Sequence, residues 1–278
     1  MAETTLVRHH TVAGTFYPGD KPTLDKEVDR LLAEASRKPI NGTLVALIAP
    51  HAGYQYSGAT AANGYKLLKD KMFDSVVIVS PSHREYFDGI SVYNGVAYST
   101  PLGNLDVQEQ LRDELAASDD IIEVSNRGHR EEHAIEVHLP FLQKVLGDVK
   151  ILPIVMGDQR REYCFHLGEK LSNILKGKNA LLIASTDLSH YHPYAIAKAL
   201  DKIIIMDIAR FNYELVMQDL EMERAEACGG GPTVAVLLAA SRLGANRVQI
   251  LHQCNSGDIT GDHSGVVGYM SAAVLRSN

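Results

Sequence analysis

The sequence predicts a single α/β domain spanning residues 1–278, with a central, mainly parallel β-sheet flanked by helices. One reason is that short apolar runs alternate with longer amphipathic stretches along the chain, which is the pattern of strand–helix–strand units. A second is that no Pro- or Ser-rich linker and no long charge block divides the 278 residues, so one domain is the simpler interpretation. A third is the apolar content of 45%, which is ordinary for a globular chain.

The expected strands are compact apolar runs rich in Val, Ile and Leu, which are typical of strands buried on both faces. The last two runs are expected to end the chain as two further strands. In chain order, the strands are expected at residues 43–49, 75–80, 150–156, 179–185, 247–253 and 266–275.

The expected helices are the stretches with apolar residues at helical spacing between these runs. Ser57 is the expected N-cap of the first helix, Pro140 is expected to kink the third, and Pro232 suits the first turn of the last. The expected helices cover residues 57–71, 106–117, 132–146, 160–176, 194–212 and 233–243.

Charge, terminus and cysteine usage restrict the partners of this chain. A net charge of −7 speaks against a nucleic-acid binder, because phosphate contacts need clustered Lys and Arg. The longest apolar runs are far shorter than the roughly 18 residues of a membrane span, and the first residues lack a signal-peptide pattern. Cys164, Cys228 and Cys254 form no CxxC pair, which fits a reducing compartment. We therefore expect a cytoplasmic protein that binds neither nucleic acid nor membrane.

Histidines follow three of the predicted strands at the same point. His51 and His83 come directly after two of the apolar runs, and a third run leads into Asp187 and His190. Ligands of open α/β sheets bind beyond the carboxyl ends of the strands, so these side chains would converge if the three strands are neighbours. Neutral imidazole is a common ligand of iron, copper and zinc, and two histidines with one anionic ligand leave open positions. The sequence thus favours a metal site.

Residue types and spacing leave the third, anionic ligand open. Cys228 precedes a glycine-rich turn and a predicted helix, and a helix N-terminus lowers the pKa of a thiol and favours the metal-binding thiolate. The alternative for Cys228 is a small buried residue at a tight turn. Glu132 and Glu136 share one face of a predicted helix with His133 close by, which indicates a supporting or substrate-side segment, or simply a solvated helix. The candidates are Asp187, Glu132, Glu136 and Cys228.

His190 is interpreted as an acid/base residue held by Asp187. The two residues are three apart, a spacing that brings the side chains together in a helical turn. A carboxylate beside an imidazole moves the pKa of that imidazole towards or above neutral, where proton transfer is effective. The alternative is a loop cap, in which Asp187 bonds backbone amides and His190 packs on Tyr191.

Motifs along nearly the whole chain resemble those of one family. The chain is identified as a member of the Memo family, also called the system-B component of the AmmeMemoRadiSam gene neighbourhoods. The motifs are AGTFYP at 13–18, APHAGY at 49–54, SPSH at 80–83, TPLG at 100–103, EHAIEVHLPF at 132–141, STDLSHY at 185–191, ACG at 227–229 and VGY at 267–269.

The resemblance implies a fold similar to the catalytic subunit of class III extradiol ring-cleaving dioxygenases, which use non-haem Fe(II). His51 and His83 match the two metal histidines of that family, and His190 matches the acid/base position with Asp187 in the same pocket. Cys228 stands where the dioxygenases have a carboxylate. A thiolate ligand also suits Cu(I) or Zn(II), so Fe(II) is expected first and these two ions second.

The resemblance also carries expectations about ligands and partners. The gene neighbourhoods imply a functional link to AMMECR-type and radical-SAM proteins. Tyrosines near the expected pocket suit a planar small molecule or a peptide, and the expected lining includes Tyr17 and Tyr56. The residues expected to contact the ligand are Tyr54, Glu132, His133 and Tyr191.

Three functions from different classes fit these residues. The first is a metal-dependent oxidoreductase in which iron acts on a small, phenolic substrate with O₂. The second is a metal- or peptide-binding module without catalysis, which animal members of the family suggest through phosphopeptide interactions. The third is a zinc- or thiolate-based hydrolase or transferase.

Overall fold

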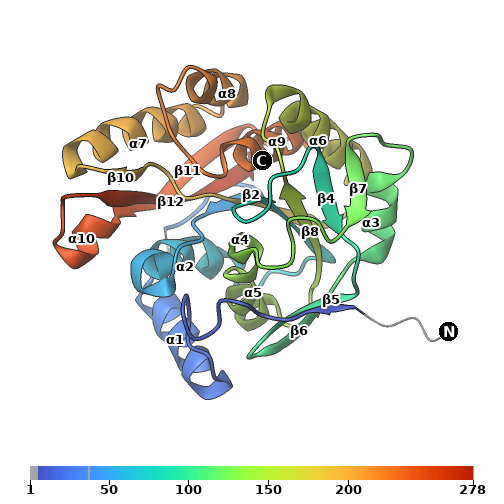
Figure 1. The fold of residues 1–278 in the computed structure, drawn as a ribbon, viewed down its shortest axis with the longest axis horizontal. Coiled ribbons are helices and arrows are strands. Elements are labelled where there is room, and N and C mark those ends of the chain that lie inside the picture. Colours follow the sequence, from blue (N-terminus) through green and yellow to red (C-terminus); the bar gives the residue numbers. More distant parts are fainter. Residues whose placement is uncertain (1–5, 37, 278) are drawn as a thin grey trace.

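The structure is a computed structural model, and it describes residues 6–36 and 38–277. Its strands form one large sheet and one small one (Figure 1). Their bounds are β1 Val7–Arg8, β2 Thr43–Ala49, β3 Ser75–Pro81, β4 Ile90–Tyr93, β5 Ala97–Thr100, β6 Gly103–Asp106, β7 Ile122–Ser125, β8 Lys150–Met156, β9 Ala180–Ser185, β10 His190–His192, β11 Arg247–Asn255 and β12 Val266–Arg276.

The large sheet has nine strands in the order β10-β12-β2-β9-β3-β8-β4-β7, with β11 also paired to β12. The four strands β2, β9, β3 and β8 are parallel neighbours. At the flanks, β12 runs antiparallel to β2 and β4 runs antiparallel to β8. The expected parallel sheet therefore describes the centre of the molecule, and antiparallel flanks make the sheet as a whole mixed.

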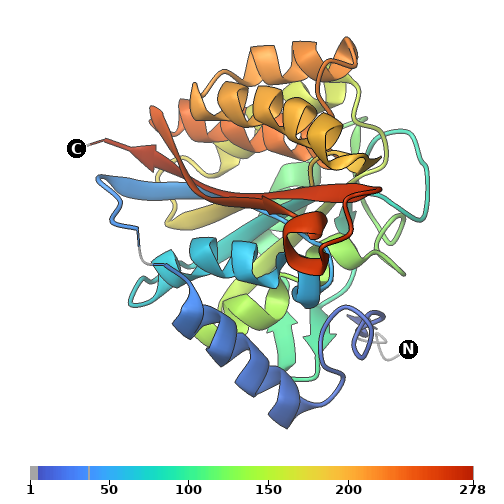
Figure 2. The same ribbon diagram turned by 90° about the vertical axis from the view of Figure 1, so that its left-hand side faces the viewer.

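Helices cover both faces of the large sheet (Figure 2). The longer helices are α1 Lys21–Glu34, α2 Ala59–Tyr65, α3 Glu109–Ala116, α5 Leu139–Leu146, α6 Arg161–Ile174, α7 Tyr194–Ala209, α8 Tyr213–Glu221 and α9 Gly230–Arg242; the short ones are α4 His133–Glu136 and α10 Ser256–Thr260. Within the described residues, none of the helices is both long and apolar enough to cross a membrane.

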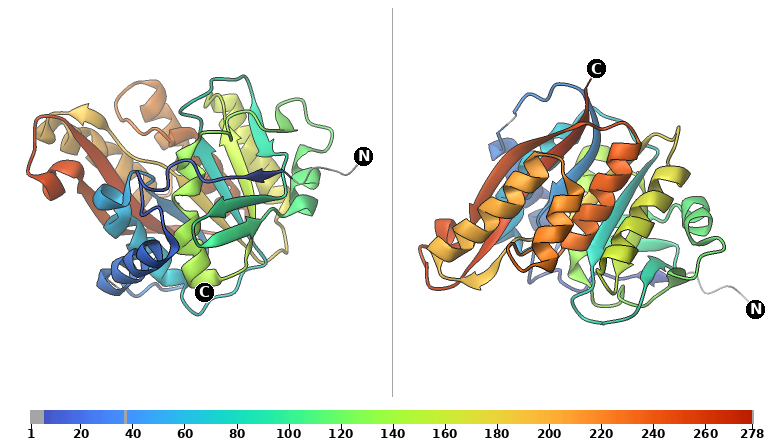
Figure 3. Two further views of the ribbon diagram at one scale, coloured as in Figure 1. Left: turned by 60° about the horizontal axis from the view of Figure 1, so that its bottom comes forward. Right: turned by 90° about the horizontal axis from the view of Figure 1, so that it is seen from above.

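The two faces of the sheet have separate hydrophobic cores. One core packs α3, α6, α7, α8 and α9 on the sheet, and the right-hand view of Figure 3 shows these helices from their own side. The other core packs α1, α2, α5 and the small β1-β5-β6 sheet on the opposite face. Because both faces are covered, the central strands carry apolar side chains at nearly every position, which explains their uninterrupted apolar runs.

Two expected helices differ from the observed ones. The stretch 57–71 is a π-helical turn, Tyr54–Gly58, followed by α2 and a 3₁₀ turn, Lys66–Leu68. Ser57 therefore lies inside the first turn rather than at its N-cap, and its hydroxyl donates to the carbonyl of Ala52. The stretch 132–146 is two helices, α4 and α5. Pro140 stands in the first turn of α5, where a missing amide N–H costs nothing, and causes no kink.

The order of the strands places three of the predicted site residues at one edge. Strands β2, β9 and β3 are adjacent and parallel, so their carboxyl ends lie side by side. His51 follows β2, Asp187 follows β9 and His83 follows β3. The expectation that these strands are neighbours is confirmed.

Candidate metal centre

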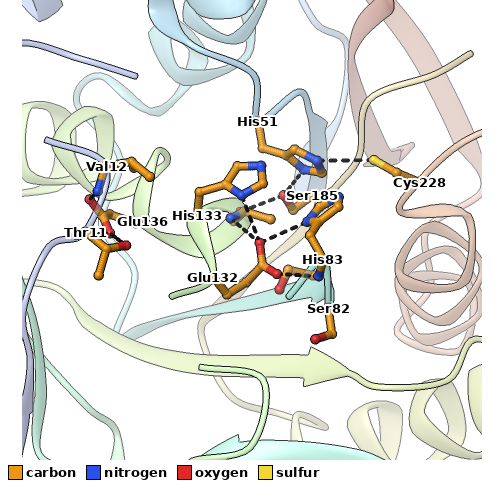
Figure 4. Close-up of polar contacts among 12 residues, drawn as sticks. Thr11, Val12, His51, Ser82, His83, Glu132, His133, Glu136, Ser185 and Cys228 are labelled. Carbon is orange, nitrogen blue, oxygen red and sulfur yellow. Dashed lines mark hydrogen bonds and ion pairs between the residues drawn. The ribbon is translucent and has the colours of Figure 1, made fainter. Parts of the chain in front are cut away.

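Two histidines and one cysteine bring their ligand atoms together beyond this edge of the sheet (Figure 4). His51, His83 and Cys228 each offer one ligand atom, and the three atoms lie within 4.8 Å of one another. The Nε2 atom of His51 lies 3.1 Å from the sulfur of Cys228. The imidazole rings of His51 and His83 are 5.0 Å apart between centroids. Metal–ligand bonds of about 2.0–2.3 Å are compatible with a common ion between these atoms after small side-chain movements.

Ser185, the last residue of β9, determines which nitrogen of His51 carries the proton. Its hydroxyl oxygen lies 2.7 Å from Nδ1 of His51, 2.8 Å from Nε2 of His138 and 2.7 Å from the carbonyl oxygen of Ala134. A carbonyl can only accept, so the single hydroxyl proton goes to Ala134 and both imidazoles must donate to Ser185. His51 therefore has its proton on Nδ1, and the lone pair of Nε2 faces Cys228.

The tautomer of His138 follows from the same argument. Its Nε2 donates to Ser185, so its Nδ1 accepts the hydroxyl proton of Tyr65 at 2.8 Å. Tyr65 and His138 are both buried, and no other proton arrangement satisfies every group in this chain of bonds. The chain of bonds extends from the core to His51.

His83 is oriented by a buried carboxylate. Glu132 is 1% exposed, and one of its oxygens lies 2.9 Å from Nδ1 of His83 while the other accepts the amide of His83 at 2.6 Å. Although burial favours the protonated acid, these bonds hold the pKa of Glu132 below its ordinary value. The carboxylate keeps the proton on Nδ1 of His83 and leaves Nε2 free, which is the usual arrangement around metal-binding histidines.

A second group, formed by His83, Glu132 and His133, also has its ligand atoms within 4.8 Å of one another. Both oxygens of Glu132 are occupied, however, because besides His83 the carboxylate accepts the amide of Ala134 and caps α4. Nδ1 of His133 lies 3.3 Å from Glu132 without the geometry of a hydrogen bond. The group with Cys228 therefore fits a metal better, because its ligand atoms are engaged only weakly: the sulfur of Cys228 contacts Nε2 of His51 at 3.1 Å and accepts the amide of Asp187 at 3.3 Å.

The pKa of the Cys228 thiol differs from the expectation. Burial and the nearby carboxylate of Asp187 raise the pKa of Cys228 well above that of an ordinary thiol, whereas the helix N-terminus was expected to lower it. The residue lies before the first turn of α9, and its sulfur accepts the amide of Asp187 at 3.3 Å. Without a metal Cys228 is a protonated thiol, and metal binding must release that proton.

Asp187 and His190 do not form the expected pair. Residues 186–189 make no helical turn, and a carboxylate oxygen of Asp187 accepts the amide of His51 at 2.8 Å instead. His190 starts β10, and its ring contacts that of Tyr191 with centroids 5.8 Å apart. Burial lowers the pKa of His190, so the expected rise is wrong. The alternative of a loop cap describes both contacts correctly.

A cavity of about 610 Å³ opens beside these residues and has His51, His83 and Asp187 at its lining. His133, His190 and Tyr191 also line it, as do Tyr56 and Phe16. A larger cavity, of about 960 Å³, is lined in part by the turn that carries Cys228, but both groups of candidate metal ligands among the described residues include residues that line the smaller one.

Three residues that were expected to line the ligand pocket instead bind other residues of the protein. Tyr54 is buried, and its hydroxyl donates to the carbonyl of Val137 at 2.7 Å. Tyr17 is buried and its hydroxyl donates to Glu136. Glu132 holds His83 rather than facing the cavity. The π-helical turn explains Tyr54, since it directs this side chain into the core beneath the cavity.

Glu136, one of the candidate anionic ligands, anchors the N-terminal segment. It is fully buried and pairs with Arg8. Its oxygens also accept the amides of Thr11 and Val12 and the hydroxyl of Tyr17. Figure 4 shows Glu136 apart from the histidine cluster. A carboxylate satisfied by this many donors is a structural anchor and not a metal ligand.

Sequence reasoning did not identify Ser185, His138 or Glu226 as parts of the site. Glu226 accepts the amide of His190 at 3.2 Å and contacts Nε2 of His192 at 2.7 Å. It lies on the turn that carries Cys228 and thereby ties this turn to β10. Each of these roles depends on a contact between distant segments, for which the local sequence pattern holds no signal.

The fold and the site define an α/β protein with a candidate metal centre at the carboxyl edge of a parallel sheet, and the comparisons with known proteins place it in a family. Residues 8–273 match the family model of the Memo-like proteins. The chain is 39% identical over 273 residues to a MEMO1 family protein of Methanosarcina mazei, covering 96% of this chain and 99% of the relative. It is 37% identical over 270 residues to one of Aquifex aeolicus, covering 97% and 99%. The chain belongs to the Memo family, as its motifs indicate.

A solved structure shares the fold. An uncharacterised protein of Escherichia coli K12 superposes with a TM-score of 0.58 and 16% sequence identity, covering 84% of this chain and all of the other. The architecture is consistent with the expected similarity to extradiol dioxygenases.

Proposed function

We propose that the protein binds one first-row transition-metal ion, Fe(II) by preference, through His51, His83 and Cys228, and acts as an oxidoreductase on a small ligand in the adjoining cavity. The observation that carries this proposal is the orientation of the two imidazoles. Nδ1 of each is fixed by another residue, Ser185 or Glu132, so each presents Nε2 to a shared space beside the sulfur. Such outer partners are typical of metal-binding histidines.

The bound ion would supply redox chemistry with O₂ and an open position for the ligand. The other residues of the chain have separate tasks. His190 lines the cavity, and because burial lowers its pKa it is neutral, which is the form that can accept a proton from the ligand; the lowered pKa also makes it a weaker base than an ordinary imidazole. Asp187 holds the amide of His51 and so fixes the loop that follows β2.

A comparison of three variants tests this division of labour. The protein is loaded anaerobically with Fe(II), and bound iron and O₂ uptake with a panel of phenols are then measured. His51→Ala should lose the iron. His190→Ala should keep the iron, whereas O₂ uptake falls by about 10²–10⁴-fold, the usual scale for acid–base catalysis. The exposed His9 gives a control, His9→Ala, that should change neither quantity.

The outcomes separate the proposal from its alternatives. If His190→Ala loses iron as completely as His51→Ala, His190 is a ligand and its assigned role is wrong. If the wild type retains zinc but no iron and hydrolyses esters or amides, the alternative function as a hydrolase is correct. If it binds peptides without retaining any metal, it is a binding module.

A further inference from the structure

The cavity beside the candidate metal centre has aromatic side chains on its walls. Phe16 lies against the ring of His133, with centroids 4.8 Å apart. Tyr56 and Tyr269 contribute further walls, and Tyr191 stands beside His190. Rings on several sides of a small cavity favour a flat, aromatic ligand, because stacked and edge-to-face contacts add to the burial of apolar area.

Tyr191 is held at this cavity by an unusual backbone conformation. Its φ is 59°, in the left-handed region that residues other than glycine seldom adopt. The pairing of β10 with β12 shifts register between His190 and His192, on either side of Tyr191. Such irregularities re-aim side chains next to functional sites. Tyr191 is 79% exposed, so a large aromatic side chain that the core does not need is available to a ligand.

The charged residues at the cavity also indicate which kind of ligand it binds. Among the described residues that line it, none is Lys or Arg, whereas Asp262 is present together with the buried Asp187. Arg84 borders a separate small cavity, and Arg8 is paired with Glu136 in the core. Bonds from the amide and hydroxyl of Ser264 hold the pKa of Asp262 below its ordinary value, so this carboxylate is ionised.

Recognition of a phosphate group needs positive side chains or free amides, usually an Arg cluster. Helix α10 also borders the cavity, but it has only five residues, and a capping box at its start takes up the amides of Asn255 and Asp258. Without a bound metal ion, the described residues that line the cavity therefore offer a phosphate no positively charged side chain, while an ammonium group would meet the carboxylate of Asp262 and the faces of nearby rings.

We propose that the cavity binds a planar aromatic ligand that carries a cationic amine and that, in the metal-free protein, it disfavours a phosphorylated one. The ring would stack on Tyr191 and the amine would face Asp262. This inference rests on the proposed function for its choice of cavity and names the ligand class of that site.

Three probes with the same ring and different charges test the inference: tyramine, 4-ethylphenol and 4-ethylphenyl phosphate. Their affinities are measured by calorimetry for the metal-free protein and for protein loaded with redox-inert Zn(II), and bound zinc is measured separately. Tyramine should bind about 3–10-fold more tightly than 4-ethylphenol, which corresponds to one cation–π or charge contact of about 1 kcal/mol. In the metal-free protein the aryl phosphate should bind at least about tenfold more weakly than 4-ethylphenol.

Variants assign these differences to residues. Asp262→Asn should abolish the preference for tyramine and leave the affinity for 4-ethylphenol unchanged. Tyr191→Ala should weaken tyramine and 4-ethylphenol by about 3–10-fold. Tyr86 is similarly exposed, at 77%, and is not part of the cavity lining, so Tyr86→Ala is the matched control and should bind the probes like the wild type. None of the three variants should alter the zinc content.

The results separate this inference from the proposed function. Tighter binding of the aryl phosphate than of 4-ethylphenol to the metal-free protein would overturn the inference, as would the absence of saturable tyramine binding up to about 10 mM. An unchanged preference for tyramine in Asp262→Asn would also overturn it. If the expected order holds in a protein that retains no metal, the inference stands and the metal-dependent function fails.

Discussion

The Nε2 atom of His51 and the sulfur of Cys228 lie 3.1 Å apart although 177 residues separate them in the sequence. Burial has opposite chemical consequences for the two groups. It lowers the pKa of His51 well below that of an ordinary imidazole, with the neighbouring His83 and His133 adding to the effect, and it raises the pKa of Cys228. In the absence of a metal the contact therefore joins a neutral imidazole and a protonated thiol.

The first prediction is that metal affinity rises with pH. Cys228 must lose its proton when it binds the ion, whereas His51 is already neutral, so one proton is released. Between about pH 7.5 and 9, where ordinary imidazoles are neutral, the association constant for Zn(II) should increase about tenfold per pH unit. Competition with a chelator of known pH dependence measures this slope. The slope should disappear in Cys228→Ala, and a flat profile in the wild type would mean that the thiol is not a ligand.

The second prediction concerns Ser185, whose hydroxyl oxygen accepts hydrogen bonds from His51 and His138. Ser185→Ala leaves two buried donors without an acceptor, which should lower the free energy of unfolding by about 1–3 kcal/mol. Metal affinity should fall by about 10–100-fold, the usual effect of losing an outer partner. Imidazole ¹⁵N shifts of the metal-free protein give a readout that a purely structural role would not predict. The wild type should show His51 protonated on Nδ1, and the variant should show a mixture of tautomers.

Ser189 provides the matched control for this variant. It is equally buried, and its hydroxyl has no hydrogen-bond partner in the described part of the chain. Ser189→Ala should therefore leave metal affinity and the His51 tautomer unchanged. A wild-type His51 protonated on Nε2 would contradict the assigned direction of the bonds around Ser185.

The third prediction concerns the anchor of the N-terminal segment. Glu136→Gln leaves the buried guanidinium of Arg8 without its counter-charge, which should cost about 3–5 kcal/mol in the free energy of unfolding. Urea denaturation measures this change. The exposed pair of Arg30 and Glu34 gives the control, because Glu34→Gln should change stability by less than about 0.5 kcal/mol. Equal effects of the two variants would refute the assigned role of Glu136.

The sequence predicted the central strands and the position of the site well, because both depend on local patterns. Strands buried on both faces have uninterrupted apolar runs, and parallel strands present their carboxyl ends at one edge. His51, His83 and Asp187 follow such runs, so their convergence required only that β2, β9 and β3 be adjacent. Helix α1 was missed although Asp20, which caps it, and a proline in its first turn were readable.

The remaining parts of the site depend on geometry that the sequence does not encode locally. A π-helical turn reverses the expected direction of Tyr54. An extended segment after β9 separates Asp187 from His190, although their spacing fits a helical turn. The raised pKa of Cys228 results from burial by tertiary packing, which outweighs the effect of the following helix.

The most direct test of the central claim is the metal stoichiometry and affinity of freshly purified protein under anaerobic conditions. Fe(II), Zn(II) and Cu(I) are titrated into the wild type, into Cys228→Ala and into Cys254→Ala, a control that removes a half-buried thiol outside the group of ligand atoms. We predict one metal site per chain in the wild type and in Cys254→Ala. In Cys228→Ala the metal affinity should be at least about 100-fold lower, because a residue that binds the ion directly is lost. Equal affinity in all three proteins would contradict the metal centre formed by His51, His83 and Cys228.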